Sequence, residues 1–181
     1  MVLIGIVGKK YSGKSTIASH LVEHHRFVEF AFATPLKSVC MEAFGFSHKQ
    51  LYGSMLEKES VDPYWGISPR QALQDVGKMF RDLYKVRPQY NQIWVRVVER
   101  SLSRLDSTWN IVVSDVRYKD EANMIRKRGG ILIGVYRSDL MTTDHHESEN
   151  QDIQVNIVIR NDGSIDDLKR KVDEVVERLY K

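Results

Sequence analysis

Five short apolar segments predict the strands of a buried sheet. The first is broken only by Gly5, and the third contains Ile111, Val112 and Val113 in succession. Apolar runs without polar alternation are typical of parallel strands that are covered on both faces. The predicted strands comprise residues 2–7, 27–32, 110–114, 131–136 and 155–159.

Apolar residues recur at helical spacing in the segments that separate these strands. The helix after the first strand is expected to keep His20 on its polar side, and Ser164 can cap the last helix. In the segment 35–105, Ser68 and the proline after it mark a helix start, whereas residues 52–66 have the character of a loop. This alternation predicts an α/β protein with a three-layer α/β/α fold and a mostly parallel five-stranded sheet.

Composition narrows the class of protein. The chain has 181 residues, of which 42% are hydrophobic, enough for one domain with a buried core. Its net charge of +3 is spread without long runs of like charge, so it suits a small anionic ligand as well as a polymer. A single cysteine, Cys40, excludes an intramolecular disulfide, and no apolar run approaches the length of a membrane span. We expect a soluble protein of the cytoplasm.

The segment 8–15 reads Gly-Lys-Lys-Tyr-Ser-Gly-Lys-Ser, which fits the P-loop pattern G-x-x-x-x-G-K-[ST] between a predicted strand and a predicted helix. Glycines let the backbone amides turn towards phosphates, and the helix start adds partial positive charge. Lys14 is expected to reach the β- and γ-phosphates of ATP, Ser15 to bind Mg²⁺, and Thr16 to donate to the α-phosphate. The ATP-binding residues that this motif predicts are Gly8, Lys10, Ser12, Gly13, Lys14, Ser15 and Thr16.

The metal of a P-loop enzyme also needs a carboxylate, and Asp115 offers one. Asp115 follows a predicted buried strand, so it should emerge at the carboxyl edge of the sheet, as the P-loop does. Ser15 and Asp115 are therefore the predicted metal ligands. Arg117, two residues further on, can hold a transferring phosphoryl group. A helix-capping Asp115 and a surface Arg117 are the structural alternatives.

Polar residues of the segment 35–105 have the chemistry of a second anion site. Arg70, Gln74 and Arg81 recur at near-helical intervals. Arginine matches phosphate oxygens in pairs, and glutamine can pair with a base edge, so this set can hold a nucleoside monophosphate. For each residue, a solvated helix face is the alternative. The predicted acceptor-binding residues are Lys37, Trp65, Arg70, Gln74 and Arg81.

The polar stretch 137–154 is long for a connection in a compact domain, which is typical of lids. Arg137 opens it, and closure would bring a cation onto the phosphates and exclude water. We expect no dedicated zinc site from the histidines and glutamates of this stretch, because no second ligand cluster accompanies them. These residues are His145, His146, Glu147 and Glu149.

Together, these segments resemble the deoxynucleoside monophosphate kinases of bacteriophages, a branch of the P-loop nucleoside monophosphate kinase superfamily. The resemblance covers nearly the whole chain. Beyond the P-loop it rests on residues 32–37 (FATPLK), 68–77 (SPRQALQDVG) with Arg81, Trp94, 114–118 (SDVRY) with Glu121 and Ala122, 146–149 (HESE) and 161–164 (NDGS).

The resemblance implies ATP as donor, a deoxynucleoside monophosphate as acceptor, Mg²⁺ as cofactor and the supply of DNA precursors as the role. It implies one kinase domain made of a core, an acceptor-binding region and a lid, which correspond to residues 1–34 with 106–181, 35–105 and 137–154. It also implies Lys14, Asp115, Arg117 and Arg137 as catalytic residues, with Asn161 and Gly163 near the donor adenine. It allows a homodimer and implies neither a membrane nor a stable nucleic-acid partner.

Three alternatives share part of this pattern. A kinase of another small phosphorylated acceptor, such as phosphomevalonate or dephospho-coenzyme A, would use the same site logic. A nucleic-acid-stimulated P-loop ATPase would hydrolyse ATP faster with DNA, and a nucleotide-sensing module would bind without chemistry. Trp94 lies at an apolar helical position, so we expect it in the core rather than in a stacking platform for nucleic acid.

Overall fold

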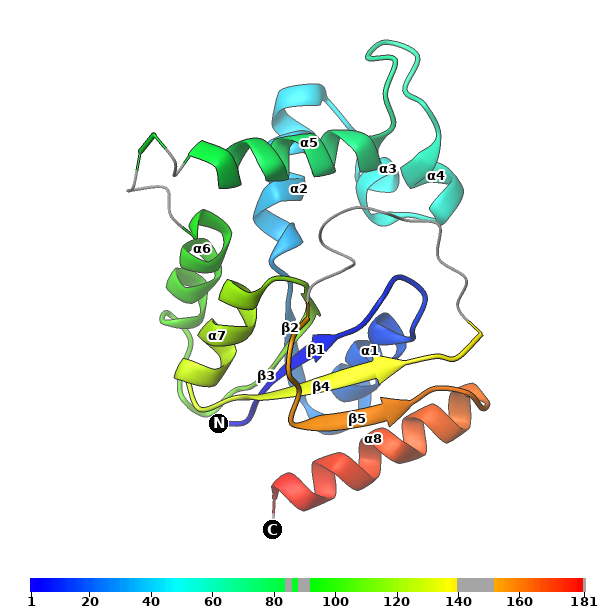
Figure 1. Ribbon diagram of the computed structural model, residues 1–181, viewed down its shortest axis with the longest axis vertical. Coiled ribbons are helices and arrows are strands. Elements are labelled where there is room, and N and C mark those ends of the chain that lie inside the picture. Colours follow the sequence, from blue (N-terminus) through cyan, green and yellow to red (C-terminus); the bar gives the residue numbers. More distant parts are fainter. Residues whose placement is uncertain (84–85, 88–91, 140–151, 181) are drawn as a thin grey trace. The chain divides into compact units, whose positions relative to one another are not determined.

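The computed structural model describes residues 1–83, 86–87, 92–139 and 152–180 (Figure 1). The chain forms two compact units. Unit 1 consists of Met1–Ala31 and Val98–Lys181, and unit 2 consists of Phe32–Val97. Each unit has its own buried core.

Unit 1 is built on one sheet of five parallel strands in the order β2-β3-β1-β4-β5. The α/β class and the five-stranded sheet predicted from the sequence are confirmed. Several strand ends differ from the prediction by one or two residues. β2 ends at Phe30, β3 continues through Asp115 to Val116, and β5 begins only at Ile157. The strands are β1 (Leu3–Val7), β2 (Phe27–Phe30), β3 (Asn110–Val116), β4 (Ile131–Tyr136) and β5 (Ile157–Arg160).

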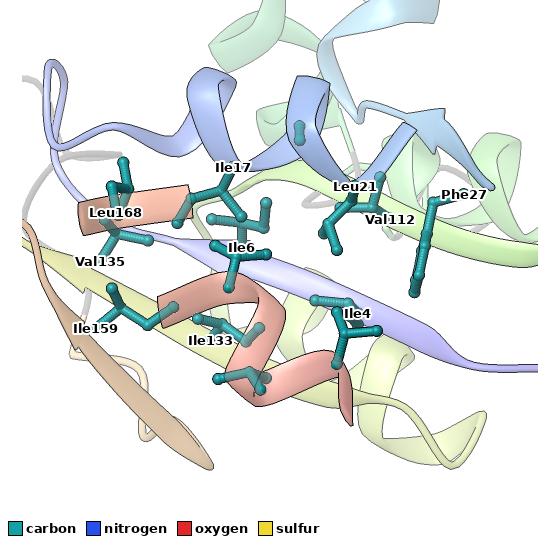
Figure 2. Packing of buried hydrophobic residues seen from close by; sticks show 14 residues of the cluster. Ile4, Ile6, Ile17, Leu21, Phe27, Val112, Ile133, Val135, Ile159 and Leu168 are labelled. Atoms are coloured by element: carbon teal, nitrogen blue, oxygen red, sulfur yellow. The ribbon is translucent and has the colours of Figure 1, made fainter. Parts of the chain in front are cut away.

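Helices cover both faces of this sheet. On one face, α1 (Lys14–His25) and α8 (Ile165–Leu179) share an apolar cluster with the strands. Figure 2 shows Ile17 of α1 close to Ile6 of β1, with Ile4 further along the same strand. Each such side chain, fully buried, contributes about 1.5–3 kcal/mol to folding. This cluster holds α1, and so the segment that leads into it, against the sheet.

The other face of the sheet is covered by α7 (Lys119–Lys127), which packs on β1 and β4. The approach is closest at Gly5. A Cβ there would lie 2.7 Å from Leu132 and 3.2 Å from Ile125 of α7, so neighbouring side chains would have to move. The two covered faces explain why the strand segments are apolar without alternation.

Unit 2 is helical. Its core contains Cys40, Phe46, Leu51 and Ala72. Ser68 accepts a hydrogen bond from the first turn of the longest of its helices, as predicted. No helix in the described part of the chain is both long and apolar enough to cross a membrane. The helices are α2 (Ala33–Phe44), α3 (His48–Tyr52), α4 (Met55–Glu59), α5 (Pro69–Asp82) and α6 (Ile93–Leu102), the last of which continues into unit 1.

Two local predictions were wrong. The expected loop at 52–66 contains α4, because Ser54 and Glu57 form a capping box in which each side chain accepts from the other's backbone amide. His20 was expected on the polar side of α1, yet it is only 6% exposed. It is buried because α8 lies beside α1 and offers Asp173 as its partner. Trp94, in contrast, is in the core as expected.

Cys40 provides a test of the unit 2 core. It is 0% exposed, and burial raises the pKa of its thiol to about 11. Because the thiolate is the reactive form, we expect the folded protein to resist a disulfide reagent at pH 8 and to react at once in denaturant. A Ser19→Cys variant, with a second thiol on an exposed helical position, is the control and should be labelled at one site without denaturant. Rapid labelling of native wild-type protein would contradict the packing described here.

Candidate active site

The loop between β1 and α1, residues 8–13, curls back on itself. Tyr11 and Gly13 adopt left-handed backbone conformations, with φ of 66° and 107°. The amide of Ser12 donates to the carbonyl of Lys9 at 3.2 Å, which closes a turn. The Nζ of Lys10 lies 4.9 Å from the centroid of the Tyr11 ring. The loop therefore has the curled form that the P-loop motif predicts.

Neighbouring atoms lie so close to Gly8 and Gly13 that neither position has room for a side chain. A Cβ at Gly8 would lie 2.6 Å from the backbone carbonyl oxygen of Val135 and 2.6 Å from the Oγ of Ser12. A Cβ at Gly13 would lie 2.6 Å from the amide nitrogen of Asn161, in a backbone conformation that only glycine adopts readily. The loop is thus pressed against β4 on one side and against the segment after β5 on the other.

Positive charge gathers at this loop. The Nζ of Lys14 donates to the carbonyl oxygens of Gly8 at 2.6 Å and of Lys9 at 2.7 Å. No side chain among the described residues caps the start of α1, whose first turn contains Ser15 and Thr16. Unpaired amides and the helix dipole make such a helix start attractive to anions. An ammonium and a helix N-terminus together can hold a polyphosphate.

Asp115 lies near the carboxyl end of β3, which pairs directly with β1. The register aligns Val116 with Val7, the last residue before the loop. Asp115 is half-buried at this edge, and Ser15 is exposed at the start of α1. A carboxylate and a hydroxyl are hard oxygen ligands of the kind that Mg²⁺ prefers, so the donor set fits the predicted ion.

Glu121 belongs to a segment that carries the family resemblance, but the sequence analysis assigned it no role. Its carboxylate is buried, with 2% exposure, and accepts from the backbone amides of Arg117 at 2.7 Å and Tyr118 at 3.0 Å. These bonds fix the turn between β3 and α7, directly after Asp115. The sequence signature of a capping box has Ser, Thr, Asp or Asn at the N-cap, whereas Tyr118 occupies that position here, so this signature does not mark Glu121.

The segment after β5 is bonded to the loop. Asn161 donates its side-chain amide to the carbonyl of Ser12 at 2.9 Å. The next residue, Asp162, accepts from both the amide and the hydroxyl of Ser138, and these bonds hold the pKa of the Asp162 carboxyl below its ordinary value. Gly163 follows, just before the helix cap at Ser164. Asn161 therefore helps to hold the loop 8–13 in position through its bond to Ser12.

Arg137, at the start of the predicted lid, forms a bidentate ion pair with Asp139, with N–O distances of 2.8 and 3.1 Å. To bind a phosphate, the guanidinium of Arg137 would have to release the Asp139 carboxylate and pair with phosphate oxygens instead. Most of the predicted lid lies outside the described residues, as do the four histidines and glutamates considered as zinc ligands. They are His145, His146, Glu147 and Glu149.

In unit 2, three of the predicted acceptor residues share one side of α5. Arg70, Gln74 and Arg81 are separated by four and seven residues, which brings them to the same face. All three are half-buried, and Arg70 lies 3.9 Å from Glu59. Gly77 lies on the same stripe, where a Cβ would be 3.2 Å from Leu36 of α2. The exposed residues of α5 lie elsewhere on the helix and include Gln71, Asp75 and Lys78.

The other two predicted acceptor residues have partners within unit 2. The Nζ of Lys37 lies 4.0 Å above the centroid of the Tyr52 ring. The indole nitrogen of Trp65 donates to the carbonyl of Phe44 at 2.7 Å, and the two rings meet edge to face. Trp65 therefore anchors the segment before α5 to the end of α2.

Comparison with known proteins decides the family. The sequence pattern described as "Deoxynucleotide monophosphate kinase" matches residues 2–74 and 84–172. The chain belongs to this kinase family. It is 37% identical over 187 residues to a protein of Acanthamoeba polyphaga mimivirus named "Putative deoxynucleotide monophosphate kinase", with 98% of this chain and 97% of that protein covered. The deoxynucleotide monophosphate kinase family predicted from the sequence is confirmed, whereas the resemblance to the bacteriophage branch stays a prediction.

The kinase fold is also found in a solved structure. Dephospho-CoA kinase from Campylobacter jejuni superposes with a TM-score of 0.53 at 13% identity, over 98% of this chain and 96% of that one. At this identity the likeness concerns the fold alone. A phosphotransferase fold of the P-loop type is thus shared between proteins whose sequences have largely diverged.

Glu121 offers a test of how this kinase site is positioned. Glu121→Ala leaves two backbone amides in a buried turn without their acceptor, so the free energy of unfolding should fall by about 2–4 kcal/mol. Glu121→Gln keeps one carbonyl oxygen for those amides and should lose less than half as much. Urea unfolding of both variants measures the difference. Equal losses would show that the turn does not depend on the accepted bonds.

Proposed function

We propose that this chain transfers the γ-phosphoryl group of ATP to the 5′-phosphate of a deoxynucleoside monophosphate. The observation that supports it most is the family match. The matched residues include the loop 8–15, Arg70 and Gln74 of α5, and the end of β3. The curled loop, the uncapped helix start and the ammonium of Lys14 add the chemistry that a triphosphate requires.

Unit 1 would hold the donor. Lys14 would exchange its bonds to the Gly8 and Lys9 carbonyls for oxygens of the β- and γ-phosphates. Ser15 and Asp115 would hold Mg²⁺, which neutralises charge on the β- and γ-phosphates when bound. Asn161 would keep the loop in its curled form, with Gly163 beside the donor adenine.

Unit 2 would hold the acceptor. The half-buried stripe of Arg70, Gln74 and Arg81 offers two guanidinium groups for a phosphate and an amide for a base edge. Lys37 and Trp65 would complete these contacts. The two units would therefore divide donor and acceptor between them within one enzyme.

The transfer itself needs little acid–base chemistry. An acceptor phosphate oxygen is already anionic, so it can form a bond to the γ-phosphorus while the bond to the bridging oxygen of ADP breaks. Arg117 would neutralise charge on the transferring group, and Arg137 would add a second cation after leaving Asp139. Residues 137–154 would act as a lid that excludes water.

The proposed activity also implies a cellular location, a metabolic role and a set of partners. A cytoplasmic kinase of this kind, in the host cytoplasm if encoded by a phage, would supply DNA precursors. It would need neither a membrane nor a stable nucleic-acid partner, and it could act as a homodimer.

The loop and the β3 carboxylate give the first test. Lys14→Ala and Asp115→Ala should each lower turnover by about a hundredfold or more, because positioning and charge neutralisation supply most of the rate. Lys9→Ala is the matched control, since its exposed side chain lies in the same loop and only its carbonyl bonds Lys14. ADP release is measured with each deoxynucleotide, the ribonucleotides, phosphomevalonate, dephospho-coenzyme A, DNA and no acceptor. Turnover without an acceptor, or only with DNA, would refute the kinase proposal.

The α5 stripe gives the second test. Arg70→Ala and Arg81→Ala should each raise the KM for the deoxynucleotide about tenfold or more, since a hydrogen bond to a charged group is worth about 1.5–3 kcal/mol. The KM for ATP should stay within about twofold. Lys78→Ala removes a cation from another side of the same helix and should change neither constant. An equal rise in the KM for the deoxynucleotide and the KM for ATP would show that Arg70 and Arg81 do not bind the acceptor specifically.

A further inference from the structure

A cluster of three potential metal ligands lies between α1 and α8, away from the residues of the candidate active site. His20 and His25 come from α1, and Asp173 comes from α8. Both imidazole Nε2 atoms contact the same carboxylate oxygen of Asp173, at 2.7 and 2.6 Å. The ligand atoms of the three residues all lie within 4.8 Å of one another.

The apolar cluster below holds these side chains in place. Ile17 and Leu21 of α1 pack with Leu168, Val172 and other residues of α8, so the two helices cannot separate freely. His20 is buried, whereas the side chains of His25 and Asp173 are 21% and 42% exposed. The cluster is therefore fixed on its inner side and open to solvent on its outer side.

We propose that His20, His25 and Asp173 form a binding site for Zn²⁺. Two imidazole nitrogens and one carboxylate oxygen are a recurrent zinc ligand set, with solvent in the fourth position of the tetrahedron. Ligand atoms about 2.1 Å from a tetrahedral zinc ion lie about 3.4 Å apart. The two observed contacts would have to open by less than about 1 Å, which the exposed Asp173 side chain can provide by rotating outward.

The ligand chemistry selects the ion. Imidazole nitrogen suits zinc and its late first-row neighbours, whereas Mg²⁺ requires oxygen ligands and keeps its waters. Partial burial disfavours ionisation of Asp173, but hydrogen bonds from His25 and His20 outweigh it and keep the pKa of this carboxyl below its ordinary value. The anionic ligand is thus available at neutral pH. Bound zinc would link α8 to α1, the helix that begins at Lys14.

The surroundings of His20 also set the expected affinity. The second ring nitrogen of a metal-bound imidazole usually donates its N–H to a hydrogen-bond acceptor, which strengthens metal binding. The Nδ1 of His20 is buried and has no such partner in the described part of the chain. We therefore expect affinity in the micromolar range, weaker than in zinc fingers.

The test is zinc binding to the whole, metal-stripped chain, measured by calorimetry and by Tm in ZnCl₂. Wild-type protein should bind one equivalent and gain several degrees in Tm. Asp173→Ala and His25→Gln should weaken binding about 100-fold and abolish the gain. His25→Gln is informative because glutamine can keep the hydrogen bond to Asp173 while being a poor zinc ligand. Cobalt should report the same site through visible absorption of tetrahedral intensity, displaced by zinc.

Two control variants address other histidines. His24→Ala removes an exposed imidazole whose ring centroid lies 4.7 Å from that of His20, and His145→Ala/His146→Ala removes the pair considered in the sequence. Both controls should bind zinc as wild-type protein does. The proposal is overturned if wild-type protein binds no better than His25→Gln and Asp173→Ala. It is equally overturned if either control loses the site, since the ligands would then lie elsewhere.

Discussion

The candidate donor site depends on the close approach of the loop 8–13 to the strands beside it. At Gly8 the backbone faces the carbonyl of Val135 at a distance that excludes a Cβ, and at Gly13 it faces the amide of Asn161 in the same way. A backbone carbonyl cannot move aside cheaply, so this packing requires glycine at Gly8. The bond from Asn161 to the carbonyl of Ser12 then keeps the curl from relaxing. Because glycine has no side chain, Gly13 cannot cap the start of α1. The ammonium of Lys14 bonds the carbonyls of Gly8 and Lys9 in the same loop.

The parallel sheet gives this loop its surroundings. Because β1 lies between β3 and β4, the ends of both neighbours meet the loop at one edge. Asp115 arrives on β3, and Glu121 fixes the turn that follows it by accepting two backbone amides. On the opposite face from α7, the apolar contacts among α1, α8 and the strands resist displacement of the loop's flanks. Precise placement of a few polar groups thus rests on a large apolar core.

In unit 2, one helix combines packing with polar chemistry. Gly77 lets α5 approach Leu36 of α2, and the half-buried Arg70, Gln74 and Arg81 follow the same stripe. Half-burial limits the conformations of long side chains, so less entropy is lost when they bind an anion. Membership of the deoxynucleotide monophosphate kinase family agrees with an anion-binding role for such a stripe, which fold likeness alone could not indicate.

The sequence by itself determined the fold class, the P-loop, the five strands and the family, because these depend on periodicity and on motifs that are local in the chain. It also contains the local capping-box signal of Ser54 and Glu57, which begins α4 within the segment expected to be a loop. The partners of His20 and Asn161, in contrast, are far away in the sequence. His20 meets Asp173, and Asn161 meets Ser12, across about 150 residues of chain. Only the tertiary structure brings such residues together, because helix packing and strand order decide which polar groups face one another.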